Sequence, residues 1–196
     1  WLLDNGADWL LINSNGKTAL DLAKQQGAGR EGRTEARDVL EAWIAAEPLM
    51  EAARNGQVVV VKSILGENPK PNAGALDGRS RALYLAAEGN HVACMEELLK
   101  AGADVNYEAS VNYRGKQERH TPLMRAAYFG HCEAIKWLME WYEQEAGTND
   151  LGVPNDALKK AMDIAVAEGK PKAKAELNAW TTLQRRKRRL FKEKGE

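Results

Sequence analysis

The chain has 196 residues, of which 44% are hydrophobic and 29% are charged, and its formal net charge is zero. This balance is typical of a folded protein and excludes a chain that is disordered throughout. No apolar run approaches the roughly 18 residues of a membrane span. The opening segment WLLDNGADWLLINSNG has Asp and Gly among its apolar residues, unlike a signal peptide. Because the chain does not begin with Met, we expect a fragment or a processed product.

Five segments share one pattern, in which an apolar residue is followed by small residues and then by Gly or Asn. The apolar residues are Leu20, Leu49, Leu83, Leu123 and Met162, at intervals of 29, 34, 40 and 39 residues. After each Gly or Asn comes a second stretch with helical character, such as ACMEELLKAG or EAIKWLMEW. The pattern therefore predicts an array of helix–turn–helix units.

The segment TPLMRAAYFGH (121–131) explains how each unit is built. Thr121 is suited to cap the first helix, and Pro122 fits the first helical position because it needs no N–H there. Gly130 stands where the helix must stop in a left-handed conformation. The equivalent stops in the other units are Gly27, Gly56, Asn90 and Gly169.

TPLMRAAYFGHCEAIKWLM and LYLAAEGNHVACMEELLKAGADVN resemble ankyrin repeats, whose unit is two helices and a projecting β-hairpin with a period of roughly 33 residues. The resemblance is strongest over residues 77–140. It implies an all-α solenoid of stacked helix–turn–helix units with β-hairpin fingers, which binds partners on its concave face. The His of the family's Thr-Pro-Leu-His segment is absent from every unit, so we expect individually adapted stacking. The residues in its place are Asp21, Met50, Tyr84, Met124 and Asp163.

The uneven intervals indicate connections of different length. The segment NYEASVNYRGKQERH is longer than a standard hairpin and predicts an elongated finger over 105–120. Residues 142–157 (YEQEAGTNDLGVPNDA) are rich in turn formers and predict a second long connection. By contrast, LEAWIAAEPLMEAARNG joins two units without a hairpin.

This junction suggests two arrays. Residues 1–46 are interpreted as the end of a first ankyrin array, with a partial repeat and one further repeat. Residues 47–180 are interpreted as a second array of about four repeats. Residues 181–196 form a basic C-terminal tail.

The three histidines do not suggest a catalytic centre. His91 and His131 occupy the same repeat position, just after the turn between helices, where the family uses His structurally. His120 lies at the base of the finger, where we expect exposure to solvent. No nucleophile elbow, phosphate-binding Gly loop or HExxH motif occurs, and GAGREGR (27–33) follows a helix rather than a strand. We therefore predict that the chain is not an enzyme, with no catalytic residues and no cofactor.

The two cysteines, Cys94 and Cys132, lie far apart and lack the closed spacing of a zinc site. They are interpreted as free, partly buried thiols, and no metal is predicted. The corresponding location is an intracellular, reducing compartment: the cytoplasm first, with the nucleus or an organelle as alternatives.

The charge is distributed unevenly, because residues 185–196 carry seven Lys or Arg and two Glu, which leaves the rest of the chain at −5. The basic run consists of Arg185, Arg186, Lys187, Arg188 and Arg189. Three interpretations stay open: a solvated helical extension, a contact with a nucleic acid or with an acidic protein or lipid, and a nuclear localisation signal.

The resemblance also implies a partner-binding surface. In the groove formed by the first helices it points to Arg54, Asn55, Glu88, Arg125, Tyr128 and Phe129, and on the finger to Tyr113, Arg114 and Arg119. The expected function is a non-enzymatic interaction module or scaffold that binds another protein, as an accessory subunit of a multi-protein complex. The alternatives are a regulatory ankyrin portion of a longer enzyme and a nucleic-acid-associated protein that uses the basic tail.

Overall fold

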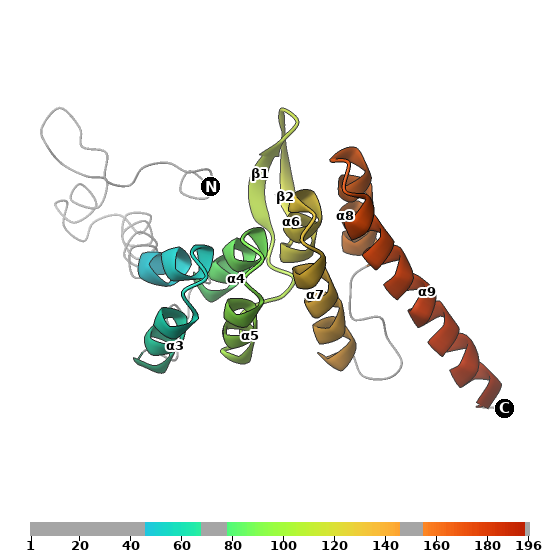
Figure 1. The fold of residues 1–196 in the computed structure, drawn as a ribbon, viewed down its shortest axis with the longest axis horizontal. Coiled ribbons are helices and arrows are strands. Elements are labelled where there is room, and N and C mark those ends of the chain that lie inside the picture. Colours follow the sequence, from blue (N-terminus) through green and yellow to red (C-terminus); the bar gives the residue numbers. More distant parts are fainter. Residues whose placement is uncertain (1–45, 68–77, 146–154, 195–196) are drawn as a thin grey trace, which may run out of the picture.

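The computed structural model describes residues 46–67, 78–145 and 155–194 (Figure 1). The first predicted array, which ends near Ala46, therefore lies outside the described residues, apart from its last position. The described chain is a row of helix pairs, each closed by a short turn. The pairs are residues 46–54 with α3 (Val58–Glu67), α4 (Gly78–Glu88) with α5 (Val92–Lys100), α6 (Pro122–Phe129) with α7 (Cys132–Glu145), and α8 (Asn155–Ala167) with α9 (Pro171–Lys194).

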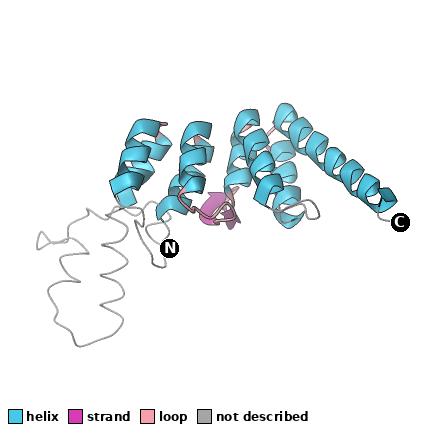
Figure 2. Cartoon of the chain, turned by 90° about the horizontal axis from the view of Figure 1, so that it is seen from below, coloured by secondary structure: helices cyan, strands magenta, loops and turns pink. Residues whose placement is uncertain are grey.

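The pairs stack so that helices of the same kind meet. The first helices pack in the order α4, α6, α8, and the second helices in the order α3, α5, α7, α9 (Figures 1 and 2). Small residues line the contacts between first helices, since Ala86, Ala87, Ala126 and Ala127 are fully buried. The described part of the chain is thus the predicted solenoid of stacked helix–turn–helix units with a hairpin finger.

The turn inside each pair has the predicted left-handed residue. Its φ angle is 68° at Gly56, 60° at Asn90, 80° at Gly130 and 64° at Gly169. The amide of Gly130 donates to the carbonyl oxygen of Ala126 over 2.9 Å, which ends α6. At the other end of α6, the Thr121 hydroxyl accepts from the Met124 amide at 3.4 Å, as predicted for a cap.

In the second and third pairs, a histidine follows the turn and contacts the preceding pair. Nε2 of His91 lies 3.0 Å from the carbonyl oxygen of Arg54, and Nε2 of His131 lies 2.8 Å from that of Glu88. Both histidines therefore have the structural role expected from their repeat position. In the last pair Lys170 takes this place and lies against Gly130.

The long finger is a two-stranded antiparallel hairpin of β1 (Ala109–Tyr113) and β2 (Lys116–His120), paired from Ala109↔His120 to Tyr113↔Lys116. Its two tip residues, Arg114 and Gly115, have φ angles of 51° and 79°. Two consecutive positive values are typical of the tight turns that suit twisted hairpins. The hairpin projects past the ends of the neighbouring helices (Figure 1).

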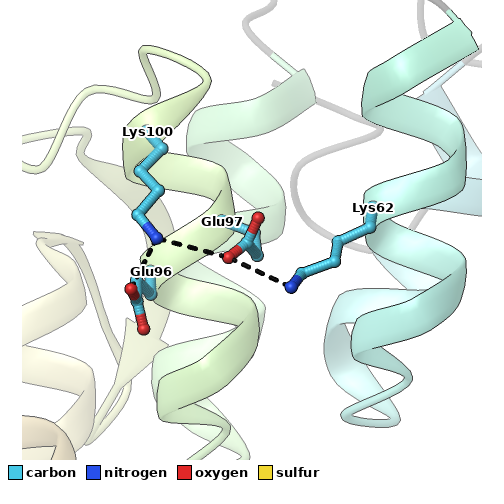
Figure 3. A network of polar contacts seen from close by, with 4 residues as sticks. All are labelled: Lys62, Glu96, Glu97 and Lys100. Atoms are coloured by element: carbon cyan, nitrogen blue, oxygen red, sulfur yellow. Dashed lines mark hydrogen bonds and ion pairs between the residues drawn. The ribbon is translucent and has the colours of Figure 1, made fainter.

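The second helices also carry charged side chains on their exposed side. Nζ of Lys62 on α3 lies 3.5 Å from Oε1 of Glu97 on α5. Lys100 contacts Glu96 at 2.6 Å and Glu97 at 3.5 Å (Figure 3). This outer ion network, consisting of these four residues, links two repeats across solvent-exposed surface.

Helix α9 continues without a break to Lys194, so the backbone of the basic run is helical. The Lys187 ammonium contacts the Glu143 carboxylate and connects this extension to α7. The connection predicted for 142–157 begins later and ends earlier, because α7 extends to Glu145 and α8 starts at Asn155. None of the helices in the described ranges has the length and apolar character needed to cross a bilayer.

Candidate partner-binding site

Arg125 on α6 lies at the centre of a cluster that we call the Arg125 cluster: Arg125, Glu88, Tyr84, Tyr128 and Phe129. Its Nε donates to Oε2 of Glu88 over 3.0 Å. The guanidinium carbon lies 4.8 Å from the centre of the Phe129 ring, 5.3 Å from Tyr128 and 5.7 Å from Tyr84. The aromatic faces attract the cation, so its position is fixed from several sides.

A charged residue at this position is not required for packing. The corresponding residues of the neighbouring repeats are Leu85 and Ile164, which are 5% and 6% exposed. Burial opposes the charge of Arg125, but the hydrogen bond that it donates to Glu88 and the nearby Tyr84 outweigh this effect and raise the pKa of Arg125. The third described repeat therefore holds a permanently charged guanidinium where its neighbours hold aliphatic side chains.

The tip of the finger is fastened to the end of α8, in a contact that we call the finger latch: Tyr113, Arg114, Ala167 and Glu168. The Tyr113 hydroxyl donates to Oε1 of Glu168 over 2.9 Å. Arg114 donates to the same oxygen from Nη2 at 3.0 Å and Nε at 3.3 Å, and to the Ala167 carbonyl oxygen at 2.6 Å. The cation of Arg114 is favourable at the carbonyl end of α8. Because the finger precedes α6 and α8 belongs to the next pair, the latch joins two consecutive repeats.

A cavity of about 250 Å³ lies between the finger, α6 and the end of α8. Its walls include two tyrosine rings, Tyr113 and Tyr128, whose centres are 6.0 Å apart in an edge-on arrangement. The residues lining the cavity are Val111, Asn112, Tyr113, Arg114, His120, Arg125, Tyr128 and Glu168. The Arg125 cluster and the finger latch therefore meet at a single hollow.

His120 corrects one expectation from the sequence. We expected exposure at the finger base, yet the residue is only 1% exposed. The hairpin register pairs it with buried Ala109, and the Tyr113 ring lies 5.3 Å away. Burial lowers the pKa of His120, against the opposing effect of Glu118, whose carboxylate lies 3.4 Å from Nε2. Its Nδ1 has no hydrogen-bond partner in the described part of the chain.

The structure brings six of the nine groove and finger candidates together at the cavity and its edge: Glu88, Tyr113, Arg114, Arg125, Tyr128 and Phe129. Arg54 and Asn55 lie at the turn of the first described pair, both exposed. Arg119 points to Glu108 instead, with Nε 3.0 Å from Oε2.

Sequence reasoning missed Tyr84 and Glu168 as members of this site. Tyr84 stands at the position of the family's motif His, and that departure was a usable signal. Glu168 corresponds in the repeat alignment to Phe129, so comparing equivalent positions in successive repeats would have pointed to it.

Other potential sites are less developed. In the basic run Arg186 is exposed and Lys187 contacts Glu143, while the placement of the remaining three side chains is not described. Cys94 is buried and Cys132 half-buried, and both are free thiols. Among the residues that the structure describes, no group of three or more His, Cys, Asp or Glu could hold a metal ion.

Comparison with known proteins gives consistent matches. The family described as ankyrin repeats (three copies) matches residues 48–172. The chain is 35% identical over 123 residues to "Ankyrin repeat and KH domain-containing protein mask-1" of Caenorhabditis elegans, which covers 62% of this chain and 4% of that protein. It is 33% identical over 96 residues to "Probable E3 ubiquitin-protein ligase XBOS32" of Oryza sativa subsp. japonica, covering 48% and 18%.

Among solved structures, the human ASB11 ankyrin repeat domain matches with 25% identity and a TM-score of 0.48, over 67% of this chain and 53% of that one. The chain spans a small part of the length of both curated relatives.

Proposed function

Because the chain belongs to the ankyrin repeat family, whose repeats are generally protein–protein interaction modules, we propose that it binds a partner protein. The proposed surface consists of the first helices, meaning residues 46–54, α4, α6 and α8, together with the finger. The role is non-catalytic, as an accessory subunit of a larger assembly.

The observation that carries the proposal is the Arg125 cluster. Aromatic and Arg side chains supply a large share of binding energy at protein interfaces, above all when they are held in place before binding. Phe129 is 37% exposed although it is a large apolar side chain. Tyr128 and Arg125 are half-buried beside it. Exposed Arg54 and Asn55 extend the proposed surface toward the first described repeat.

The histidines support a non-catalytic role. His91 and His131 bond to backbone carbonyl oxygens of the preceding repeat, and His120 is buried. The free thiols of Cys94 and Cys132 support a reducing compartment for this module.

Affinity capture followed by cross-linking tests the proposal. The intact 196-residue chain is compared with a Tyr128→Ala/Phe129→Ala variant and with a control, Val59→Ala/Val60→Ala, which removes exposed apolar side chains from α3. We expect the first variant to lose a partner that the intact chain and the control retain, with cross-links near α6 and the finger. Identical partners and cross-links for all three chains would refute the proposed surface.

A second candidate function is regulation of a longer enzyme. It is favoured by one observation: a matched relative is named a probable E3 ubiquitin-protein ligase, and the chain covers only 18% of it. Comparing ubiquitin transfer by the full-length source protein with and without residues 47–180 tests this candidate. Equal rates would exclude a regulatory role in that reaction.

The basic end of α9 supports a third candidate, a contact with nucleic acid or an acidic protein. Contacts with phosphates weaken steeply as salt increases. Binding to a single-stranded RNA probe should therefore fall with salt and disappear on deletion of residues 185–196. RNA binding that survives the deletion would exclude this role of the tail.

A further inference from the structure

The cavity under the finger contains two guanidinium groups with donors to spare. Each Arg side chain has five N–H donors in a planar fork. In the described structure, Arg125 uses Nε toward Glu88, and Arg114 uses Nε and Nη2 toward Glu168 and Ala167. The other terminal N–H groups of both residues remain for a ligand that accepts hydrogen bonds.

The charges around the cavity are balanced in pairs. The lining holds two guanidinium groups and one carboxylate, that of Glu168. His120 adds no charge near neutral pH, because burial lowers its pKa from 6.5. Glu88 approaches Arg125 from α4 and is not part of the lining. Glu88 and Glu168 therefore balance the two guanidinium charges, and a carboxylate is favoured by the unused N–H donors that point to the cavity rather than by a net charge.

Both arginines are held in place before any ligand arrives. The rings of the Arg125 cluster fix one guanidinium, and the end of α8 fixes the other. Such preorganisation reduces the conformational entropy that binding would otherwise remove. The volume of about 250 Å³ suits one side chain rather than a folded segment.

We propose that this cavity is a socket for one acidic side chain, Asp or Glu, of the partner protein. Its carboxylate is bound by Arg114 and Arg125, and its methylene stem lies against the rings of Tyr113 and Tyr128, which line the cavity side by side. Bidentate hydrogen bonding makes a carboxylate the best geometric match to a guanidinium. This inference rests on the proposed function, because the rest of the partner would cover the first helices around the socket.

Nuclear magnetic resonance titration of the ¹⁵N-labelled 196-residue chain tests the socket. The probe is the blocked peptide Ac-GSGEGS-amide, compared with Ac-GSGQGS-amide and with Ac-GSGSGS carrying a free terminal carboxylate. We expect the Glu peptide to shift amide signals of the finger and α6. The Gln peptide should shift them about tenfold less at equal concentration. Equal shifts for the Glu and Gln peptides, or shifts confined to other regions, would overturn the proposal. A stronger response to the free terminus would also overturn it, because the ligand would then be a chain end.

Variants assign the effect to the two arginines. Arg125→Gln and Arg114→Gln should each reduce the shifts about tenfold, since a charge-assisted hydrogen bond is lost. The matched control is Arg119→Gln, which removes the same charge from the same finger at a residue that pairs with Glu108 outside the cavity. The amide spectrum reports folding directly. If Arg125→Gln unfolds the chain, the shifts measured with the Arg114→Gln variant test the proposal, because Arg114 is exposed and its replacement leaves the fold intact. A control variant that weakens binding as much as Arg114→Gln would overturn the socket.

Because this titration involves no native partner, its failure would leave the capture experiment standing. Conversely, if the capture experiment refuted the proposed surface, a positive titration would still show that the cavity binds a carboxylate. The two results therefore separate the socket from the function that it serves.

Discussion

The two long faces of the repeat array hold their charged side chains differently. On the second helices, the outer ion network joins Lys62, Glu96, Glu97 and Lys100 at the surface, with Lys62 57% and Lys100 56% exposed (Figure 3). On the first helices, Arg125 is 21% exposed and touches aromatic rings besides its carboxylate partner. Exposed ion pairs contribute little to stability and are screened by salt, whereas partly buried pairs are screened much less. The first-helix face therefore holds a partly shielded charge with several contacts, whereas the outer face holds charges that are exposed to solvent.

The largest expected effect comes from the packing that keeps the first helices close. Replacing fully buried Ala127 by Leu adds side-chain volume between stacked helices, and overpacking of this kind costs about 1–3 kcal/mol of unfolding free energy. Ala93→Leu on α5 adds the same atoms at an exposed position and should change little. Urea unfolding of both variants measures the difference. Equal stabilities would mean that the first helices are not tightly packed.

Removing one carboxylate from each face gives the next effect. Glu88→Gln should destabilise the chain by about 1 kcal/mol, because Arg125 loses a partly shielded charged partner. Glu97→Gln should have a smaller effect that disappears in concentrated salt, since both of its Lys partners are exposed. Urea unfolding at low and high salt checks both. Equal salt dependence of the two variants would contradict the contrast between the faces.

Opening the finger latch should act locally. Glu168→Gln weakens the contacts of Tyr113 and Arg114 with the end of α8. We expect faster hydrogen exchange of the β1 and β2 amides with little change in global stability, because local opening and global unfolding are separate events. The control is Glu108→Gln, which removes the exposed partner of Arg119. Unchanged exchange in the hairpin would show that the latch does not hold the finger.

The smallest effect is a pH dependence from His120. Its pKa in the folded chain lies below the ordinary value of 6.5 because of burial, with Arg125 and Lys160 acting in the same direction and Glu118 against it. As the pH decreases below 6.5, the unfolded chain takes up a proton that the folded chain does not, so the folded chain becomes less stable. Above pH 6.5 the histidine is neutral in both states and this effect vanishes. Between about pH 7 and pH 5, the intact chain should therefore lose more unfolding free energy than His120→Gln. Parallel curves would contradict this.

The sequence was informative wherever the cause is local. Thr121 and Gly130 act on backbone groups within a few residues, so the ends of α6 followed from the segment itself. His120 was misjudged because its burial depends on the hairpin register and on α6 packing against the finger. The Arg114–Glu168 contact joins residues that are 54 positions apart in the sequence. The repeat pattern predicts which helices stack, but it does not predict which side chains pair across such a separation.

The same limit applies to the Arg125 cluster. Glu88, Arg125, Tyr128 and Phe129 were candidates by repeat position, but no pattern indicated that they touch one another. Their convergence depends on how α4 stacks on α6, which is a tertiary property.

Helix α9 extends beyond the helices on which it packs (Figure 1). It has 24 residues, so its length is about 36 Å at 1.5 Å per residue. Its first part packs on α7 and α8, and the Lys187–Glu143 contact ties its later part to α7. In this arrangement the C-terminal end of α9 and the tip of the finger lie on opposite sides of the array (Figure 1). A partner that contacted the finger and the basic run at the same time would therefore need two contact points with a matching separation.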